Sequence, residues 1–585
     1  KPQWALLGAT FIAICSFLPL YLAPASVAEI VKPLFVVLAV SLGLSWILAL
    51  CQTTTFGNFI LKEAVPGGAM KDPYDTKLYH KFEKFLTLLI KRRFVTLTTV
   101  FVTLVLSLVI MAVMPQSFFP KMNKPYFRAD LVFPEGFSIH AVDQDVMKVE
   151  GYLKNHEKVK SYSVTLGGTP LRYYLASSSF GPKSNYANVM VETKDPEDAA
   201  EVEQQFYEHM TQNFPNIITR SALFALSPVP EAAIEIGFIG ENPDTLTALV
   251  ERAKKIARQC DMVTDIRSNW GDKVPVWKPM FSQQKGLRLG ITRQQVANSF
   301  RTATNGLPLG EYREGDVSLP ILLKDEDVEK MNLNDVKSVP VFSTKGNSVK
   351  VEQVIDNFAL GYDYNVVRRF NRERCMMMQC EPRRGANTMA AFKQVLTAVQ
   401  EQMRLPEGYK MKYFGEQETQ DVSNAALAKN IPLTFLLIYV VLLFLFPSNY
   451  RKPVLIMLML PLVFIGVVWG LLLFGKSLDF FAILGLLGLI GMNIKNAIVL
   501  VDEIGLQLKD GKGAVPAVVE ATKTRIVPVT MASGTTILGM LPLLGDAMFA
   551  GMAATIMGGL FVSTVLTIFV LPVTYCIFFK IRADR

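Results

Sequence analysis

The sequence predicts a membrane-embedded α-helical bundle of eight transmembrane helices, joined to a large α+β region outside the membrane. Half of the 585 residues are hydrophobic and 19% are charged, which is less charge than soluble chains usually carry. The apolar residues form runs of about 16–30 residues, and a bilayer span needs roughly 20. The runs lie at Trp4–Leu22, Leu34–Leu50, Phe94–Val113, Ile431–Phe446, Val454–Phe474, Phe480–Val501, Ile526–Leu544 and Met548–Phe579.

Basic residues predict the orientation of these spans. Seventeen lysines and arginines lie in the connection 62–93, in the connections after the fourth and sixth runs, and in the tail. The short connections on the other side hold only Lys32 and Lys476. By the positive-inside rule, the tail is cytoplasmic and residues 114–430 lie outside the cytoplasm. Because the basic residues lie between spans, the net charge of +9 does not indicate a nucleic-acid partner.

The first two apolar runs resemble the last two. Phe-Leu-Pro-Leu at 17–20 precedes a second run, and Met-Leu-Pro-Leu at 540–543 does the same near the C-terminus. Repeated halves are typical of secondary transporters, whose sites lie where the repeats meet. The chain also starts at Lys1 and shows no signal peptide. We therefore expect a missing N-terminal half, either a separate chain or preceding sequence, that carries further spans and an external domain.

The connection after the second run predicts an amphipathic helix at Pro73–Ile90. Such a helix lies along the membrane surface, here the cytoplasmic one, in contact with membrane lipids. The apolar face holds Tyr74, Leu78, Phe82, Phe85, Leu86 and Leu89, and the lysines away from it are Lys77, Lys81, Lys84 and Lys91.

The external region alternates strand-like and helix-like segments, which predicts two compact α+β subdomains of ferredoxin-like βαβ units. Residues 272–364 are richer in strands and turns and are expected as an insert in the second subdomain. The strand-like segments are Tyr126–Phe133, Ala187–Glu192 and Ala233–Gly237. The amphipathic helical segments are Ile139–Asn155, Glu197–Asn213, Pro243–Gln259, Thr292–Thr304 and Thr388–Met403.

Lys495 most directly suggests ion coupling. It lies within the apolar run Leu489–Val501. A lysine near mid-span costs at least about a few kcal/mol unless it is paired or solvated, so it indicates a functional site; snorkelling to the interface is the alternative. Asp502 lies about 10 Å farther toward the cytoplasm. The partner acid is therefore expected on a missing helix, and Gly485, Gly488 and Gly491 would let another helix approach closely.

Four further residues complete the expected proton relay. Asn496 directly follows Lys495. Arg525 opens the seventh span, where it either anchors the interface or lines a proton exit. Thr530 and Ser533 lie on the same span, and their hydroxyls suit either a hydrogen-bonded proton path or helix packing.

Tyr173, Tyr174, Phe180 and Tyr186 gather aromatic rings in the glycine- and serine-rich segment Gly167–Tyr186. A mobile aromatic loop suits the capture of large apolar ligands, so these four residues are the candidate substrate contacts. An ordinary surface loop is the alternative.

Other chemistries have no convincing site in the sequence. Gly470–Ser477 fits the phosphate-loop pattern GxxxxGK[ST], but it lies in a membrane span and not in a loop, so ion drive is favoured over ATP. The cysteines and histidines show neither a disulfide framework nor metal-ligand spacing. Met376–Met378 would alternate between the faces of a strand and could not converge on one ion. We expect no enzyme, metal site or cofactor, because no nucleophile–base set is present.

Four segments resemble the resistance-nodulation-division (RND) multidrug exporters. Gly491–Glu503 (Gly-Met-Asn-Ile-Lys-Asn-Ala-Ile-Val-Leu-Val-Asp-Glu) is similar to their tenth transmembrane helix, and Arg525–Leu543 to their eleventh. Pro115–Pro120 resembles the start of their second porter region, and Leu307–Gly315 their docking segment. The resemblance covers essentially the whole chain and identifies it as the C-terminal half of such a permease.

The resemblance implies a homotrimer in the bacterial inner membrane, driven by the proton-motive force, with a periplasmic adaptor and an outer-membrane channel as partners. It implies that Lys495 and Arg525 belong to a relay whose two aspartates lie on the absent fourth helix. The sequence departs from the family at Ala532, where many members carry a relay threonine, and Thr530 or Ser533 is the candidate substitute. The aromatic segment falls where the family has its substrate switch loop.

The resemblance also divides the chain into parts. These are 1–61, the last two transmembrane helices of the first repeat; 62–93, a cytoplasmic linker; 94–114, a transmembrane helix; 115–226, the first porter subdomain; 227–271 with 365–415, the second porter subdomain; 272–364, the docking insert; and 416–585, five transmembrane helices with the relay lysine.

The sequence is compatible with three functions. The leading one is proton/drug antiport, in which protonation of the absent acids releases Lys495 and helix tilting opens and closes the porter clefts. The second is heavy-metal export on the same scaffold, which needs converging Met, His or Cys ligands. The third is a membrane receptor or scaffold, which does not need a lysine in mid-span.

Overall fold

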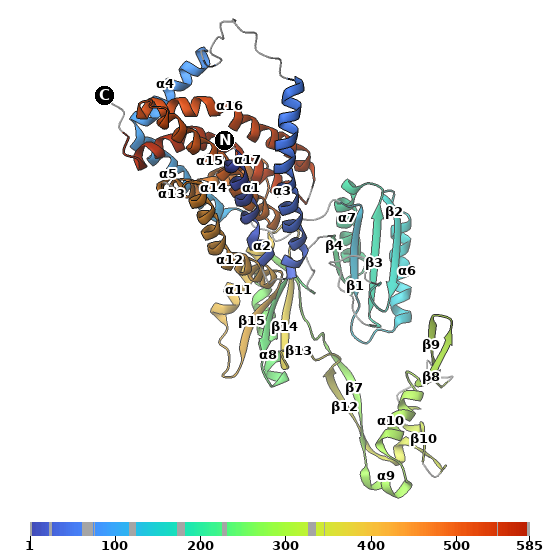
Figure 1. Cartoon of the computed structure of the whole chain (residues 1–585). Helices are drawn as coiled ribbons and strands as arrows, with labels where there is room; N and C mark the ends of the chain where they lie inside the picture. The colour runs from blue at the N-terminus through green and yellow to red at the C-terminus, as the bar shows by residue number, and fades with distance from the viewer. Residues whose placement is uncertain are drawn as a thin grey trace. The chain divides into compact units, whose positions relative to one another are not determined.

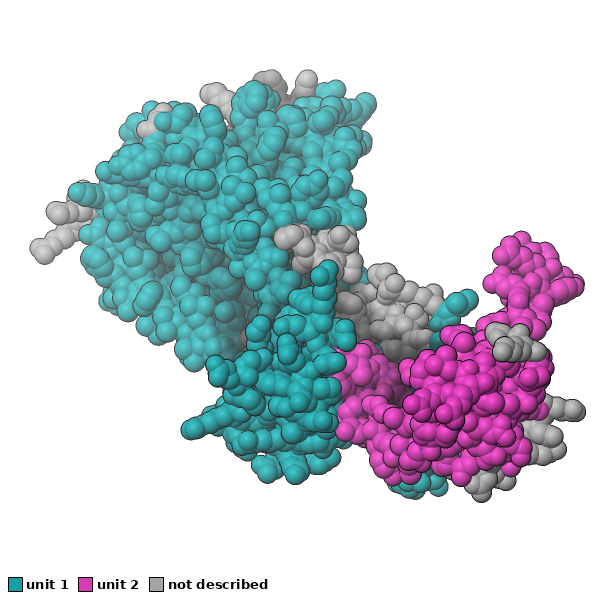
Figure 2. All heavy atoms as spheres, turned by 90° about the horizontal axis from the view of Figure 1, so that it is seen from below, with its two compact units in different colours: residues 1–269, 369–585 teal, residues 270–368 magenta. Residues whose placement is uncertain are grey.

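The computed structural model describes residues 3–22, 26–60, 74, 76–115, 124–171, 182–224, 231–325, 335–343, 346–447, 449–546 and 548–581. The chain forms two compact units, one of residues 1–269 and 369–585 and one of residues 270–368. Figure 1 shows the long helices of the first unit gathered together, with its β-sheets outside them. Figure 2 colours the two units separately.

Long apolar helices build the helical region. Over the described residues, seven helices are long and apolar enough to cross a membrane. The helices of this region are α1 (Gln3–Ser16), α2 (Leu18–Leu22), α3 (Ser26–Ile60), α4 (Lys77–Lys91), α5 (Arg93–Val113), α12 (Glu416–Leu445), α13 (Arg451–Leu458), α14 (Val463–Leu473), α15 (Phe480–Lys509), α16 (Ala514–Met540) and α17 (Ala550–Phe578).

The first apolar run differs from the expected single span. It is divided at Phe17 into α1 and α2, because Pro19 has no N–H to donate to the carbonyl of Cys15. The resulting apolar helix, Leu6–Leu22, is shorter than the other candidates. Within the described residues, the structure therefore holds seven long candidate spans and one short broken helix, where the sequence predicted eight spans.

Small residues bring the central helices close together. A Cβ atom on Gly466 of α14 would lie 2.6 Å from the carbonyl oxygen of Gly558 on α17. A Cβ atom on Gly491 of α15 would lie 2.8 Å from the Cα of Ala13 on α1. Backbones can approach this closely only where side chains are absent or small. At Gly491, four residues before Lys495, the helix that approaches α15 this closely is α1.

Helix α4 begins at Lys77, where Thr76 caps it by accepting a hydrogen bond from the backbone N–H of Tyr79 at 3.5 Å. The start expected at Pro73 lies outside the described residues. Leu86 and Ile90 are buried in the apolar core that α4 shares with the long helices. The apolar face predicted from the sequence is thus packed against protein along part of its length.

The first sheet belongs to a subdomain with the β-α-β-β-α-β order of a ferredoxin-like unit. Its strands lie in the order β2-β3-β1-β4 and its neighbouring strands are antiparallel. One face of the sheet packs on two helices and forms the core. The elements are β1 (Tyr126–Val132), α6 (Ile139–Lys154), β2 (Val159–Leu166), β3 (Tyr186–Thr193), α7 (Ala199–Asn213) and β4 (Ile218–Leu223).

The second subdomain has the same order of elements, although its two halves are far apart in sequence. Strand β14 lies between β5 and β6, and β15 pairs with the other edge of β5, all antiparallel. The elements are β5 (Ile234–Ile239), α8 (Pro243–Ala257), β6 (Val263–Ser268), β14 (Glu373–Pro382), α11 (Thr388–Gln402) and β15 (Lys410–Gly415).

The unit of residues 270–368 is inserted between β6 and β14, and the insert expected at 272–364 lies within it. Its paired strands β7 and β12 lead to a small apolar core that includes Val296, Val341 and Val351. The elements are β7 (Lys273–Phe281), α9 (Gln283–Leu289), α10 (Arg293–Thr302), β8 (Leu307–Glu314), β9 (Val317–Leu323), β10 (Pro340–Phe342), β11 (Ser348–Lys350) and β12 (Ile355–Tyr364).

Candidate functional site

Lys495 lies on an uncovered face of α15. Its side chain is exposed, whereas the adjacent Ile494 and Asn496 are buried between helices. Among the described residues, Lys495 forms no ion pair with a carboxylate. The structure therefore leaves its ammonium group facing away from the packed interior, on the side where further protein or solvent would have to satisfy its charge.

The buried side of α15 carries amides that bind hydroxyls of two other helices. Asn496 Nδ2 donates to Ser533 Oγ of α16 at 3.4 Å. Thr564 Oγ1 of α17 lies 2.6 Å from Ser533 Oγ and 2.7 Å from the carbonyl oxygen of Leu560. Because a hydroxyl has one proton, Ser533 donates to Thr564 whenever Thr564 donates to the carbonyl. The result is a continuous hydrogen-bonded chain across α15, α16 and α17.

A second amide strengthens this contact. Asn493 Oδ1 accepts a hydrogen bond from Ser563 Oγ of α17, and both residues are buried. Buried polar groups lose free energy unless they are paired, so these bonds fix how α15 and α17 are rotated relative to each other. We call Asn493, Asn496, Ser533, Ser563 and Thr564 the polar cluster.

Arg525 lies apart from the polar cluster and pairs with α15. Its Nε donates to Glu503 Oε2 at 3.1 Å, and its Nη2 contacts the same oxygen. Gln507 Nε2 donates to the other Glu503 oxygen at 2.9 Å. Thr530 is exposed and donates to the carbonyl of Ile526 within its own helix. Of the residues predicted for the relay, the structure therefore brings Asn496 and Ser533 into direct contact, and leaves Lys495, Arg525 and Thr530 separate.

Outside the helical region, charged side chains join the two ferredoxin-like subdomains. Arg220 of β4 donates from Nε to Asp265 Oδ2 of β6 at 3.0 Å. Arg384, which precedes α11, donates from Nη1 to Glu203 Oε2 of α7 at 2.8 Å and from Nη2 to Ser221 Oγ at 2.9 Å. Each subdomain thus supplies one arginine and one carboxylate to the other. We call these two reciprocal pairs the charged joint.

The charged joint has little apolar support. The guanidinium carbon of Arg384 lies 4.1 Å from the centre of the Tyr207 ring, a cation–π contact. The apolar core of the first subdomain consists of its own residues, from Phe127 to Leu223. Ion pairs separate at lower cost than a shared apolar core, because water and salt replace their partners. Separation of the two subdomains at this joint would therefore cost less free energy than unfolding either of them.

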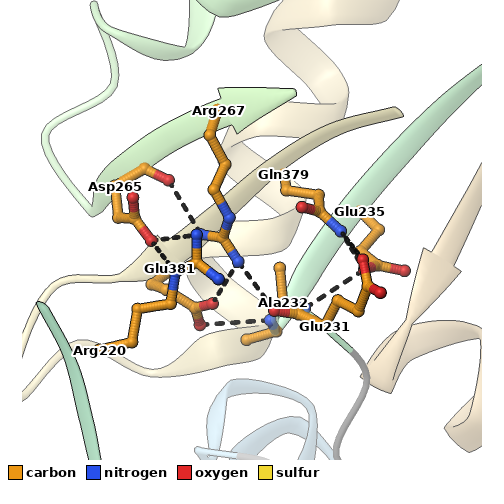
Figure 3. A network of polar contacts seen from close by, with 9 residues as sticks. Arg220, Glu231, Ala232, Glu235, Asp265, Arg267, Gln379 and Glu381 are labelled. Atoms are coloured by element: carbon orange, nitrogen blue, oxygen red, sulfur yellow. Dashed lines mark hydrogen bonds and ion pairs between the residues drawn. The ribbon is translucent and has the colours of Figure 1, made fainter. Parts of the chain in front are cut away.

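Figure 3 shows the network behind Arg220, in which Arg267 points toward Asp265 and Glu381. Arg267 Nη2 lies 3.4 Å from Glu381 Oε1, and the backbone N–H of Ala233 donates to Glu381 Oε2 at 3.2 Å. Burial raises the pKa of Glu381 and lowers the pKa of Arg220. Asp265 adopts a left-handed backbone conformation, φ 48°. The two arginines that hold its carboxylate offset the cost of this conformation.

Two carboxylates meet at one amide beside this network. Gln379 Nε2 lies 2.8 Å from Glu235 Oε1 and 3.4 Å from Glu231 Oε2 (Figure 3). Burial, with a smaller contribution from the nearby Glu231 charge, raises the pKa of Glu235 to about 7, although the hydrogen bonds from Gln379 and the Ala232 N–H act to lower it. Glu235 is therefore a group outside the spans that gains and loses a proton near neutral pH.

The four aromatic candidates divide between the described and undescribed parts of the chain. Tyr173, Tyr174 and Phe180 lie outside the described residues. Tyr186 is the first residue of β3, and its buried hydroxyl donates to Asp130 Oδ1 at 2.6 Å. Tyr186 therefore supports the sheet and is not part of an open loop, because burial and this bond hold its ring in place.

Over the described residues, no group of three His, Cys, Asp or Glu side chains is placed to hold a metal ion. Cys375 and Cys380 are buried thiols of β14, and burial raises their pKa to about 11 and about 12. Burial therefore favours the protonated form of both thiols at neutral pH and keeps them away from solvent.

The sequence pattern does not indicate most of the partners in either site. Thr564 carries no signal of its own, whereas an acid at the end of one apolar helix, Glu503, and an arginine at the start of the next do suggest the Arg525 pair. The charged joint had no such signal, because Glu203, Arg220 and Arg384 belong to different elements and only the fold brings them together.

Comparison with known proteins identifies the family. The AcrB/AcrD/AcrF family pattern matches residues 2–579. The nickel and cobalt resistance protein CnrA of Cupriavidus metallidurans is 27% identical over 360 residues, which cover 60% of this chain and 33% of CnrA. The multidrug export protein AcrF of Escherichia coli is 23% identical over 602 residues, which cover 98% of this chain and 57% of AcrF.

The fold of this chain is also similar to that of a solved structure. A crystal structure of a heavy metal efflux pump superposes with a TM-score of 0.77 at 18% identity, covering 98% of this chain and 57% of that one. The chain thus spans about half the length of the relatives that match it from end to end. Because the family pattern extends over nearly the whole sequence, the chain belongs to the AcrB/AcrD/AcrF family of RND transporter permeases.

Proposed function

We propose that this chain is part of a proton-coupled exporter of the bacterial inner membrane, in which Lys495 responds to protonation of acids that lie outside this chain. The observation that carries the proposal is the position of Lys495, exposed on α15 beside the buried polar cluster. A lysine at this depth needs an anionic partner, and protonation of that partner removes the attraction.

The polar cluster supports a coupled movement of helices. Asn496 binds Ser533 of α16, and Asn493 binds Ser563 of α17. When Lys495 loses its partner, α15 shifts, and these buried bonds make α16 and α17 shift with it. The proton-motive force thus acts by rearranging these helices, and this action requires no cofactor.

Helix α12 supports transmission of this movement out of the membrane. It follows β15 directly, after Gly415. Tyr413 Oη donates to Asp421 Oδ2 at 2.9 Å, and Lys412 Nζ lies 2.7 Å from Glu418 Oε1. These contacts stiffen the turn, so a tilt of α12 moves the second ferredoxin-like subdomain. The second subdomain then separates from the first at the charged joint, and this separation opens a porter cleft.

The hairpin of β8 and β9 supports assembly with other proteins. Both of its faces are exposed, and Leu309, Leu319 and Ile321 are among its exposed apolar side chains. A two-stranded hairpin is marginally stable alone in water, so it gains stability when a partner covers it. We infer a homotrimer that works with a periplasmic adaptor and an outer-membrane channel, with the hairpin in an interface.

Amphiphilic compounds are the proposed substrates, with Tyr173, Tyr174 and Phe180 as candidate contacts. Heavy-metal export is the second candidate, because CnrA is a nickel and cobalt resistance protein and a matching structure is a heavy metal efflux pump. The burial of Cys375 and Cys380 within β14 favours the first candidate, since a buried thiol is not open to a metal ion from solution.

A susceptibility panel separates the two candidates. The complete transporter is expressed in a pump-deleted host and tested against dyes, detergents, drugs and Ni, Co, Zn and Cu salts. Resistance to amphiphiles supports the proposal, and resistance confined to metal salts establishes the second candidate. Equal sensitivity with and without the transporter contradicts both and favours a receptor or scaffold.

A further inference from the structure

Helix α4 presents a stripe of lysines that the long helices do not use. Lys77, Lys81, Lys84 and Lys91 are all exposed, and their spacing of four, three and seven residues places them on one side of a helix. No described carboxylate pairs with any of them. Lysines elsewhere on the protein do find partners, for example Lys160 with Glu192 at 2.8 Å.

The opposite side of α4 fixes this stripe at the edge of the bilayer. Leu86 and Ile90 are buried against the long helices, and the Phe82 ring lies 5.5 Å from that of Phe569 on α17. Arg92 alone separates α4 from α5, whose 21 residues form a candidate span. Helix α4, which carries the stripe, therefore lies where a membrane helix begins; Figure 1 labels α4 and α5.

Apolar side chains accompany the lysines on the exposed side. Leu78, Phe85 and Leu88 are 75%, 49% and 46% exposed. Two nearby cations already have structural contacts. Lys523 Nζ lies 5.9 Å from the centre of the Tyr74 ring, and Arg93 Nη1 donates to the carbonyl of Ile581 at 3.4 Å. Among the described residues, none neutralises the four lysines, and the surface they form suits a ligand that offers negative charge and an apolar phase together.

We propose that the lysine stripe of α4 binds the headgroups of anionic phospholipids, while Leu78, Phe85 and Leu88 enter the acyl region. Interfacial helices combine apolar insertion with attraction of lysines to anionic lipids in this way. A soluble polyanion would match the charges but would leave the apolar side chains exposed. The inference does not depend on transport, so it can fail or succeed independently of the proposed function.

The test measures lipid selectivity. The protein is reconstituted in phosphatidylcholine vesicles with spin-labelled phosphatidylglycerol or spin-labelled phosphatidylcholine, and electron spin resonance gives the fraction of each label held at the protein surface. The wild type is expected to prefer phosphatidylglycerol, and changing Lys77, Lys81, Lys84 and Lys91 to Gln should remove most of this preference. High salt should weaken the preference of the wild type.

A matched variant controls for the loss of four charges. Lys154, Lys194, Lys393 and Lys410 are exposed lysines outside the helical region, and changing them to Gln should leave the preference intact. If the fourfold variant does not fold, the double variant with Lys81→Gln and Lys84→Gln takes its place. The double variant should lose part of the preference. An unchanged preference in that folded double variant, or no preference in the wild type, overturns the proposal.

Discussion

The charged joint yields a prediction whose magnitude follows from the structure. Arg384→Gln removes the two guanidinium bonds to Glu203, the bond to Ser221 and the contact with Tyr207. The Glu203 side chain is 11% exposed and that of Arg384 is 35% exposed. Breaking a buried ion pair costs about 3–5 kcal/mol, and an exposed one contributes about 0–1 kcal/mol. For this partly exposed pair we expect about 2 kcal/mol, or roughly a 30-fold shift toward the open joint.

Hydrogen–deuterium exchange measures this shift. The amides of the edge strands β4 and β6 that are not bonded within their own sheets should exchange at least about tenfold faster in Arg384→Gln, because opening of the joint gives water access to them. Adding Glu203→Gln should restore much of the protection, since the variant no longer leaves a buried charge unpaired. Arg252→Gln is the control, because Arg252 donates to the carbonyl of Gln402 within the second subdomain. Exchange within twofold of wild type in Arg384→Gln would refute the reasoning.

Three further predictions concern other parts of the account. The free energy of unfolding of the wild type should fall as the pH rises from 4.5 to about 7, and Glu235→Gln should remove this fall. The folded pKa is raised, so the folded chain binds more protons in this window and wild-type stability falls by about 2–3 kcal/mol as pH rises; a wild-type melting temperature that rises across it would contradict the assignment. Gly415→Ala should cost about 1–3 kcal/mol, because φ is 81° and the new Cβ would lie 3.1 Å from the carbonyl of Ala233. Its melting temperature should fall, whereas that of Gly151→Ala, on the open surface of α6, should not. Ser533→Ala should lower both export and melting temperature, since it leaves Asn496 without its partner at a cost of about 1–3 kcal/mol. Thr530 lies outside the polar cluster, so Thr530→Ala should behave as wild type.

Local sequence signals located the helices and strands well. The amphipathic segments at 139–155 and 388–403 correspond to α6 and α11 within a few residues. Their starts are clear from the sequence because Ser138 and Asn387 cap them with side-chain oxygens. The break at Phe17 shows where hydropathy alone is insufficient. A hydropathy average does not reveal the effect of Pro19, because this proline removes a backbone hydrogen bond without making the segment less apolar.

The candidate sites were less predictable, because they depend on tertiary contacts. Lys495 stands out in any hydropathy profile, but its neighbours Ser533 and Thr564 resemble ordinary membrane-helix hydroxyls. Tyr186 was grouped with loop aromatics by its position in sequence, whereas pairing of β3 with β1 buries it beside Asp130. Strand register, and not composition, decides which of these side chains are available to a ligand.

The most direct test of the account is proton coupling at Lys495. The complete transporter is reconstituted in proteoliposomes with a pH-sensitive dye inside, and proton movement is recorded when an exported amphiphile is added. We expect substrate-dependent proton movement for the wild type and for Lys509→Ala, a control at the end of the same helix. We expect none for Lys495→Ala, although that variant should assemble normally. Substrate-dependent proton movement that persists in Lys495→Ala would contradict the central claim.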